Sequence, residues 1–377
     1  MKKALENQTS VTLTAFAPKN EISRLACVWK QLSHASDPSF FLSWPWIENW
    51  LNCLPESTKV MFVGLFEDDM PIAGFFVGTQ TGIKHQVIYA QRGFLNATGD
   101  AVLDEITIEQ NGILFNGDTS QIIHKLRELI SDGSFSWDEL VCNALTLDQY
   151  HCFKQLEGES KLLEMEQEKN YFVDLEKVRH SSSGLIGLLG KSKRNRIRRT
   201  AKAYEKFGEL SITEAATHDE FTEAFSNLER LHQQAWSQRG QAGSFSNPFF
   251  KNFHQRFIEN YYASGQIKLI TCKAGNEILG VLYCFAHNDD ILFYQCGFNY
   301  KKENHYRPGL LSQLHVINYF AQQGYAKFDF LAGESRYKRK LATDHYPVYW
   351  CKLQRPKLRF SCERLLRRLK NKIRNVP

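Results

Sequence analysis

The sequence stretch that decides the fold consists of three segments in a fixed order: Leu292-Phe-Tyr-Gln-Cys-Gly-Phe298, Arg307-Pro-Gly-Leu-Leu311 and Phe328-Asp-Phe-Leu-Ala-Gly-Glu-Ser-Arg-Tyr-Lys-Arg-Lys340. The first is an apolar run of strand length, and the second places proline and glycine where a helix begins. The third starts as a short strand and ends in a charged turn. Strand, helix and strand in this order predict an α/β unit.

The same order of predicted elements occurs earlier in the chain. A hairpin predicted at 267–283 contains Ile278-Leu-Gly280, and a hairpin predicted at 60–77 contains Ile72-Ala-Gly74 at the matching place. More strands, a helix and a strand follow each hairpin. Chance similarity would explain the hairpins alone, but the repeated order favours a tandem duplication. We therefore predict an α/β (α+β) fold with two similar domains, each a mixed, mostly antiparallel sheet flanked by helices.

Changes in composition predict four regions along the chain. We expect an N-terminal domain at 1–180, a basic helical connector at 181–208, a C-terminal domain at 209–356 and a basic amphipathic tail at 357–377. In the connector, Ser181-Ser-Ser-Gly184 is expected to cap the basic helix, on which Ile197, Ala201 and Tyr204 form an apolar stripe.

Composition predicts a globular cytoplasmic protein. The 377 residues exceed one ordinary core, 43% are hydrophobic, and no apolar run approaches the roughly 20 residues that span a bilayer. The first residues lack the hydrophobic stretch of a signal peptide. The nine cysteines are scattered singly, which indicates neither a disulfide framework nor a metal site.

The net charge of +6 is unevenly distributed. Residues 191–206 and 357–374 each contain eight Lys or Arg and one Glu, so the rest of the chain is acidic. The first basic segment contains a single aromatic residue, Tyr204, which makes nucleic-acid binding an unfavoured interpretation. The second predicts a peripheral contact with an anionic inner membrane, with a solvated tail as the alternative.

These segments, taken together, resemble a known family. With Leu231-His-Gln-Gln-Ala-Trp-Ser-Gln-Arg-Gly240, the early Phe40-Phe-Leu-Ser-Trp-Pro-Trp-Ile-Glu-Asn-Trp-Leu51 and the basic Lys191-Ser-Lys-Arg-Asn-Arg-Ile-Arg-Arg199, the chain resembles GNAT-type acyltransferases of the cellulose-biosynthesis-associated (CelD-like) group. That group is close in fold to the FemAB aminoacyltransferases. The resemblance implies tandem GNAT-like domains and transfer of an acyl group, with acetyl-CoA or another acyl-CoA as the donor and no metal.

The resemblance places the donor along the strand at 291–298 and its pyrophosphate at the start of the next helix. Free N–H groups and the helix dipole bind phosphate there, so the predicted cofactor-binding residues are Arg307, Gly309, Leu310 and Leu311. The usual GNAT loop reads Q/R-x-x-G-x-G/A, whereas this chain has one glycine after a proline. Acyl-CoA and aminoacyl-tRNA therefore remain alternative donors, and a helix start without a ligand is the structural alternative.

A helix predicted at 219–238 carries His232, Trp236 and Arg239 along one face. His232 is a candidate acid or base because of its near-neutral pKa, although a histidine in an apolar stripe is most often a core residue. Trp236 and Arg239 are candidate substrate-binding residues, and the fork of Arg239 suits a phosphate or carboxylate.

The charged turn after 328–330 holds the remaining candidates. Glu334 is the predicted base, and by resemblance to FemAB proteins Lys338 is expected to stabilise the oxyanion. Asp329 and Tyr337 are candidate substrate-binding residues, and Tyr294 is a candidate proton donor to the leaving thiolate. The alternative is a solvated charged turn.

The predicted function is transfer of an acyl group, expected to be acetyl, to an amine or hydroxyl of a sugar in exopolysaccharide or envelope biosynthesis. The acceptor would be a small molecule or a lipid-linked sugar. Two alternatives remain: a FemAB-like transferase that uses aminoacyl-tRNA, and a non-catalytic scaffold associated with a membrane or RNA.

Overall fold

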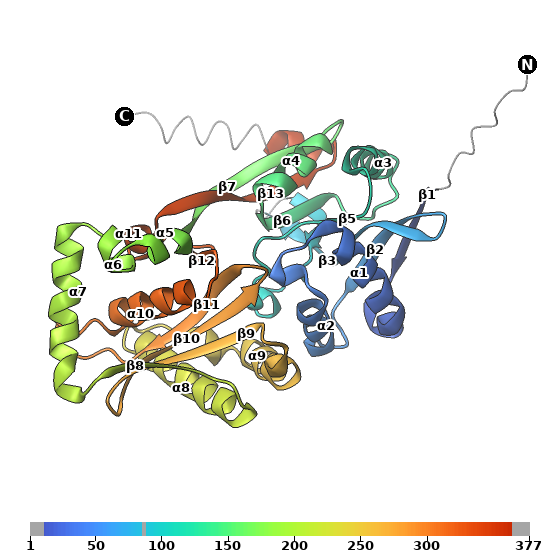
Figure 1. Cartoon of the computed structure of the whole chain (residues 1–377). Helices are drawn as coiled ribbons and strands as arrows, with labels where there is room; N and C mark the ends of the chain where they lie inside the picture. The colour runs from blue at the N-terminus through green and yellow to red at the C-terminus, as the bar shows by residue number, and fades with distance from the viewer. Residues whose placement is uncertain (1–10, 85–87, 364–377) are drawn as a thin grey trace, which may run out of the picture. The chain divides into compact units, whose positions relative to one another are not determined.

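The computed structural model describes residues 11–84 and 88–363 (Figure 1). The chain divides into two compact units, which we call unit 1 (residues 1–167 and 347–377) and unit 2 (residues 168–346). The domain boundaries expected from the sequence stay predictions. Residues 364–377, which contain most of the predicted basic tail, lie outside the described part.

Unit 1 contains an antiparallel hairpin and its flanking helices, as predicted. Its elements are β1 (Val11–Phe16), α1 (Ile22–Ser36), α2 (Trp44–Cys53), β2 (Val60–Glu67), β3 (Met70–Lys84), β4 (Ile88–Leu95), β5 (Leu114–Phe115), α3 (Thr119–Ser131), β6 (Glu139–Leu145) and α4 (Leu147–Gln155).

Unit 2 repeats this order after three additional helices. The additional helices are α5 (Leu175–His180), α6 (Leu185–Leu188) and α7 (Lys191–Tyr204). The repeated elements are β8 (Leu210–Glu214), α8 (His218–Ser237), α9 (Pro248–Tyr261), β9 (Ile267–Ala274), β10 (Glu277–His287), β11 (Asp290–Phe298), α10 (Pro308–Gln322), β12 (Lys327–Asp329) and α11 (Lys338–Leu341).

The two units have matching sheets. The strand order is β1-β2-β3-β4-β6 in unit 1 and β8-β9-β10-β11-β12 in unit 2, and β5 pairs with β3. In these two strand orders one pair of neighbours is parallel, β4 with β6 in unit 1 and β11 with β12 in unit 2, and the other pairs are antiparallel. Helices lie on the sheets, so the predicted class of mixed, mostly antiparallel sheets flanked by helices is confirmed.

Two long strands pass from one unit to the other. β7 (Lys161–Asp174) begins in unit 1 and ends in unit 2, where its residues 172–174 pair with β12. β13 (Asp344–Gln354) begins in unit 2 and ends in unit 1, where its residues 349–354 pair with β6. Each unit therefore takes its final strand from the other repeat.

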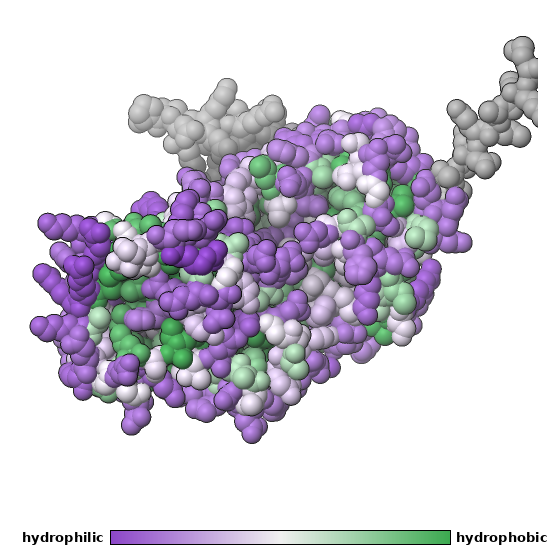
Figure 2. Space-filling model, in the orientation of Figure 1, coloured by the Kyte–Doolittle hydropathy of each residue, from purple (hydrophilic) through white to green (hydrophobic). Residues whose placement is uncertain are grey.

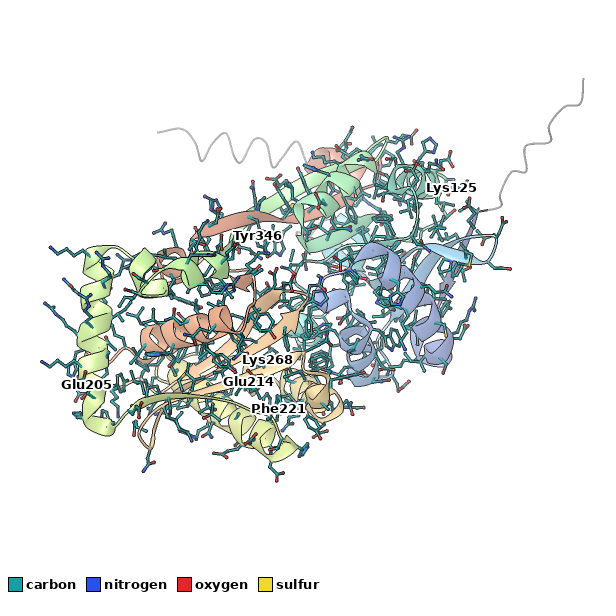
Figure 3. All side chains as sticks on the ribbon, in the orientation of Figure 1. Lys125, Glu205, Glu214, Phe221, Lys268 and Tyr346 are labelled. Atoms are coloured by element: carbon teal, nitrogen blue, oxygen red, sulfur yellow. The ribbon has the colours of Figure 1, made fainter. Side chains whose placement is uncertain are left out.

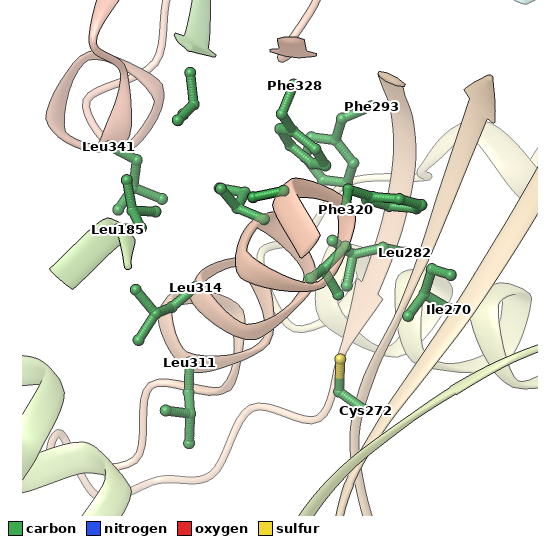
Figure 4. Close-up of a cluster of buried hydrophobic side chains, with 14 of the residues drawn as sticks. Leu185, Ile270, Cys272, Leu282, Phe293, Leu311, Leu314, Phe320, Phe328 and Leu341 are labelled. Atoms are coloured by element: carbon green, nitrogen blue, oxygen red, sulfur yellow. The ribbon is translucent and has the colours of Figure 1, made fainter. Parts of the chain in front are cut away.

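The core of unit 2 forms between α10 and the sheet (Figure 4). Phe320 of α10 lies near Phe328 of β12, and Phe293 of β11 stacks against the same Phe328 ring at 5.7 Å. Leu311 and Leu314 extend this contact along α10. The apolar periodicity of α10 is thus explained by burial on one face of the sheet, while α8 contacts β10 and β11.

The basic segment forms a helix, α7, but it begins differently from the prediction. Ile197 and Tyr204 are buried and Ala201 is partly buried, as the apolar stripe predicted. The expected cap from Ser181–Gly184 is wrong, because α5 and α6 intervene and Gly190 precedes α7 without a side-chain cap. Within the described ranges, every helix is too short or too polar to cross a membrane.

Candidate functional site

The candidate site lies beside the last part of β11. Pairing between β11 and β12 ends at Leu292 and Asp329, where β12 itself stops, so residues 293–298 of β11 extend past it. Tyr283 pairs with Gln295 and Cys284 with Phe293, which makes Tyr294 the extra residue of a β-bulge. A bulge redirects side chains and frees strand backbone for other partners.

A pocket of about 480 Å³ adjoins this segment, and we call it the β11 pocket. Gln295 and Cys296 line it from the strand. Seven of the residues predicted from the sequence also line it: His232, Trp236, Arg239, Arg307, Gly309, Leu310 and Tyr337. The end of α8, the end of β11 and the start of α10 thus meet in unit 2.

Two glycines permit this convergence. A methyl group at Gly297 would lie 2.6 Å from the carbonyl oxygen of Leu228 and 2.9 Å from the backbone nitrogen of His232. A methyl group at Gly309 would lie 3.0 Å from the Phe298 ring. The absence of side chains at these positions brings α8 and α10 close to β11.

His232 is buried, with 2% of its surface exposed, and it borders the pocket. The pKa of His232 is lowered, mainly because burial disfavours the charged imidazolium. The nearby Arg239 charge also lowers this pKa, whereas the hydrogen bond with Gln233 partly opposes the change. The Gln233 amide donates to the carbonyl of Ala242, so its Oε1 faces His232 Nδ1 at 3.2 Å. This arrangement favours a proton on Nδ1 and leaves Nε2 as the basic nitrogen.

Arg239 supplies a positive charge to the same pocket. Its guanidinium carbon lies 5.6 Å from the ring centre of Trp236 and 5.5 Å from that of Tyr300. Stacking on aromatic rings orients a guanidinium and leaves its hydrogen-bond donors available. In the part of the chain that the structure describes, no carboxylate lies within 4 Å of it.

Three further titratable groups of the pocket, Cys296, Tyr300 and Tyr337, have raised pKa values and stay protonated at neutral pH. Burial raises the pKa of Cys296 to about 12, against the lowering effects of Lys338 and Arg239. Burial also raises the pKa of Tyr300 and of Tyr337, although 41% of the whole Tyr337 residue is exposed. Cys296 is therefore unsuited to act as a thiolate nucleophile, and both phenols can donate protons.

A second pocket of about 380 Å³ shares Arg307, Leu310 and Tyr337 with the first. We call it the cation pocket. Its five positively charged lining residues come from α7, the start of α10, the turn before α11 and α11 itself: Lys193, Arg196, Arg307, Arg336 and Lys340. Leu189, Leu310 and Leu341 supply apolar lining.

The charges of the cation pocket repel one another. The pKa of Lys340 is lowered first by Arg336, then by burial and by the charges of Arg196, Lys193 and Arg307. None of the five has a carboxylate within 4 Å, counting the residues that the structure describes. An anion with several negative charges would relieve this repulsion.

Five residues predicted for the site lie outside both pockets, and three of these are Leu311, Tyr294 and Asp329. Leu311 is 1% exposed and belongs to the core of unit 2. Tyr294 lies in an aromatic cluster with His254 and Phe285. Asp329 is buried, accepts hydrogen bonds from the Tyr346 hydroxyl at 2.7 Å and the Leu331 amide at 2.8 Å, and has its pKa raised to about 6 by burial.

The two predicted catalytic residues of the charged turn line neither the β11 pocket nor the cation pocket. Glu334 lines a separate small pocket, where the hydroxyl of Tyr171 donates to it at 3.5 Å. The Lys338 ammonium donates to the carbonyls of Leu331 at 3.3 Å and Ala332 at 2.6 Å. These bonds assign Lys338 a part in shaping the turn before α11.

Sequence reasoning did not single out several lining residues. Lys193 and Arg196 were considered only as part of a basic run, and Arg336 and Lys340 only as part of a charged turn. A signal existed for the first cluster, because residues 191–204 contain no acidic residue, whereas the charged turn also contains Glu334. Gln295, Cys296 and Gln313 are ordinary strand and helix residues, and no local pattern distinguishes them.

The matching helix of unit 1 begins in another way. Asp118 caps α3, and its carboxylate accepts from the backbone amides of Ser120 at 2.9 Å and Gln121 at 3.4 Å. Arg307, at the same place before α10, makes no side-chain cap. A carboxylate already occupies the amides in unit 1, so the start of α10 is the better anion site.

Comparison with known proteins identifies the type of domain. Residues 191–339 match the profile of a family described as Acetyltransferase (GNAT) domain. The matched range contains α7, α8, β11, α10 and most residues of both pockets. This part of the chain is similar to GNAT acetyltransferase domains, and the predicted enzyme class, an acyltransferase, is confirmed.

Solved structures share the fold over most of the chain. FemX is 9% identical, with a TM-score of 0.54 and coverage of 94% of this chain and 99% of its own. L-PGS from Bacillus licheniformis is 13% identical, with a TM-score of 0.51 and coverage of 88% and 91%. A conserved protein of unknown function from Bacteroides thetaiotaomicron is 14% identical, with a TM-score of 0.52 and coverage of 92% and 100%.

At these identities the likeness shows the fold alone. A search of curated proteins found no match. Among the described residues, no group of three or more His, Cys, Asp or Glu side chains could hold a metal ion.

Proposed function

We propose that the protein transfers an acyl group, acetyl in the simplest case, from acyl-CoA to an amine or hydroxyl of a sugar used for exopolysaccharide or envelope synthesis. The observation that carries the donor assignment is the cation pocket, where five positive charges, none with a carboxylate within 4 Å among the described residues, adjoin the β11 pocket. GNAT domains generally use acyl-CoA, and its phosphates match this charge.

The donor would lie across the two pockets. Its phosphates would occupy the cation pocket, where Arg307 and the first amides of α10 meet Lys193 and Lys340. Its acyl arm would extend into the β11 pocket along residues 293–298, whose backbone reaches past the end of β12. The shared residues Leu310 and Tyr337 line both parts of this path.

Within the β11 pocket the step is a direct transfer. The acceptor nitrogen or oxygen attacks the thioester carbonyl, and Nε2 of His232 takes the proton that the acceptor loses. The carbon–sulfur bond then breaks, and the leaving thiolate takes the proton back from the His232 imidazolium, which restores the neutral ring. The lowered pKa of His232 keeps its imidazole neutral before the reaction and makes its protonated form a stronger acid, and the raised pKa values keep the phenols of Tyr337 and Tyr300 protonated, so that they can donate hydrogen bonds to the thiolate.

The acceptor class rests on the resemblance to the CelD-like group. The lining is compatible with a sugar, because Trp236 offers an aromatic surface and Gln295 and Gln313 offer amide groups. Arg239 would hold a negative or hydroxyl-rich part of the acceptor.

An aminoacyl-tRNA donor is the second candidate. The cation pocket suits its phosphates equally well, and the basic helix α7 adjoins that pocket. A non-catalytic scaffold is the third, and it predicts that His232 and Arg307 can be replaced without loss of any activity.

The first experiment is calorimetric titration with acetyl-CoA. We expect binding in the micromolar range, weakened at least about tenfold by Arg307→Ala or Lys340→Ala, because each removes a charge-assisted contact with phosphate. Arg256→Ala removes an exposed charge remote in sequence from the pocket and is the matched control. Pantetheine, which lacks the phosphates, should bind weakly to all variants.

The outcomes separate the candidates. If acetyl-CoA does not bind while charged tRNA does, and Arg307→Ala weakens the tRNA, the donor is aminoacyl-tRNA. If acetyl-CoA binds and its affinity is the same in Arg307→Ala, Lys340→Ala and the control, the cation pocket is not the donor site.

A further inference from the structure

Helix α7 carries cations on two flanks of its buried face. Lys193 and Arg196 line the cation pocket on one flank. On the other flank, four cations follow the spacing i, i+3, i+7 and i+11 and form a row about 16 Å long. We call these residues the outer row: Lys191, Arg194, Arg198 and Lys202.

Local stability does not explain the outer row. Neighbouring like charges on a helix repel, and Lys191 and Arg194 stand in the first turn, at the positive end of the helix dipole. Across residues 11–84 and 88–363, no carboxylate lies within 4 Å of any member. Figure 3 shows side chains with nitrogen ends projecting from α7 away from the rest of unit 2.

An exposed apolar side chain adjoins the row. Leu188, the last residue of α6, is 42% exposed and precedes Lys191 by three residues. Figure 2 shows the strongly hydrophilic edge of the molecule at α7 with apolar surface beside it. Tyr204, the aromatic residue of α7, is 1% exposed and cannot stack on a base.

The surface of an anionic bilayer would bind both the outer row of cations and the exposed Leu188 side chain. Anionic headgroups would neutralise the row, and the leucine would enter the interfacial region, whereas a dissolved polyanion gains nothing from an exposed leucine. We propose that α6 and the outer row of α7 form a docking surface for an anionic lipid bilayer. This proposal does not depend on the donor or acceptor of the proposed function.

The test is co-sedimentation of the full chain with vesicles. We expect binding to phosphatidylcholine vesicles that contain about 30 mol % phosphatidylglycerol, little binding to pure phosphatidylcholine, and weakening with added salt. The triple variant Arg194→Gln, Arg198→Gln, Lys202→Gln should lower the partition coefficient at least about tenfold. The matched triple variant Arg230→Gln, Arg256→Gln, Lys302→Gln removes equal charge from other exposed sites and should stay within about twofold.

A second variant tests the apolar contact. Leu188→Asn should weaken binding to the same anionic vesicles by several-fold without altering net charge. Circular dichroism and the acetyl-CoA titration show whether each variant remains folded. Equal partitioning of the two triple variants onto the vesicles would overturn the proposal. The proposal would also fail if transfer RNA displaced the protein from the vesicles at physiological salt and its binding required the same three cations.

Discussion

At the scale of single residues, burial decides which titratable groups of unit 2 can take part in proton transfer. Burial lowers the pKa of His232 and raises that of Asp329 to about 6, so in both cases it favours the neutral form. His232 borders a pocket and can use this property in chemistry. Asp329 is enclosed by its hydrogen bonds to Tyr346 and Leu331, so its shift affects stability instead.

We predict that Asp329→Asn stabilises the protein at neutral pH. The folded pKa of about 6 lies above the ordinary value of 3.8, so the stability from this group is present at low pH and is lost as pH rises through 6. The gain on substitution should therefore be greater at pH 7.5 than at pH 5, by about 1–2 kcal/mol.

Urea unfolding of both proteins at the two pH values measures this difference. Glu223→Gln alters an exposed side chain of α8 beyond its first turn and should leave the free energy of unfolding within about 0.5 kcal/mol of the wild type at both pH values. A gain from Asp329→Asn that is equal at pH 5 and pH 7.5 would contradict the assigned shift.

At the scale of elements, the site depends on the close approach of α8 to β11. Gly297 permits this approach, because any side chain there would overlap the backbone of Leu228 and His232. The bulge at Tyr294 directs Gln295 and Cys296 toward the pocket that α8 borders. Helix and strand are both predictable from periodicity, but their separation depends on the absent side chain.

We predict that Gly297→Ala destabilises the protein by about 1–3 kcal/mol, because the added methyl group must displace α8. Chemical denaturation measures the loss, and reduced affinity for acetyl-CoA should accompany it. Gly82→Ala is the control, since among the described residues no atom other than those of its chain neighbours lies within 4 Å of its new methyl group. Equal stabilities of the two variants would mean that α8 can shift at no cost.

At the scale of the whole molecule, the exchange of β7 and β13 gives each unit a strand from the other repeat. Val348, Cys351 and Leu353 of β13 are at most 1% exposed, and the last two belong to the core of unit 1. Residues 347–354 of β13 therefore complete the core of unit 1, most of which is formed by residues before 168.

A chain that ends after residue 346 should consequently lose the stability of unit 1 while unit 2 stays folded. Removing the buried side chains of β13 costs more than about 5 kcal/mol, since each contributes about 1.5–3 kcal/mol. Hydrogen exchange should show loss of protection in β6 and retained protection in β11. A chain that ends after residue 356 keeps β13 and is the control; equal protection of β6 in both chains would contradict the exchange.

Most of the fold and part of the site could be predicted from the sequence. Periodicity and turn residues correctly predicted the hairpins at 60–77 and 267–283 and the helices α8 and α10, because these signals act over a few residues. The start of α10 was predicted from Pro308 and Gly309, whose positions follow from local backbone preferences. The cap expected from Ser181 failed because two short helices intervene, and no local signal announces them.

The order of the elements, their duplication and the basic segments can therefore be predicted from the amino-acid sequence, since each depends on neighbours along the chain. Only the tertiary structure decided that Lys193, Arg307 and Lys340 meet in one pocket while Asp329 and Leu311 are enclosed in the core. It also decided that β7 and β13 exchange units. The physical reason is that burial and charge clustering depend on contacts between segments far apart in the sequence, which no local pattern records.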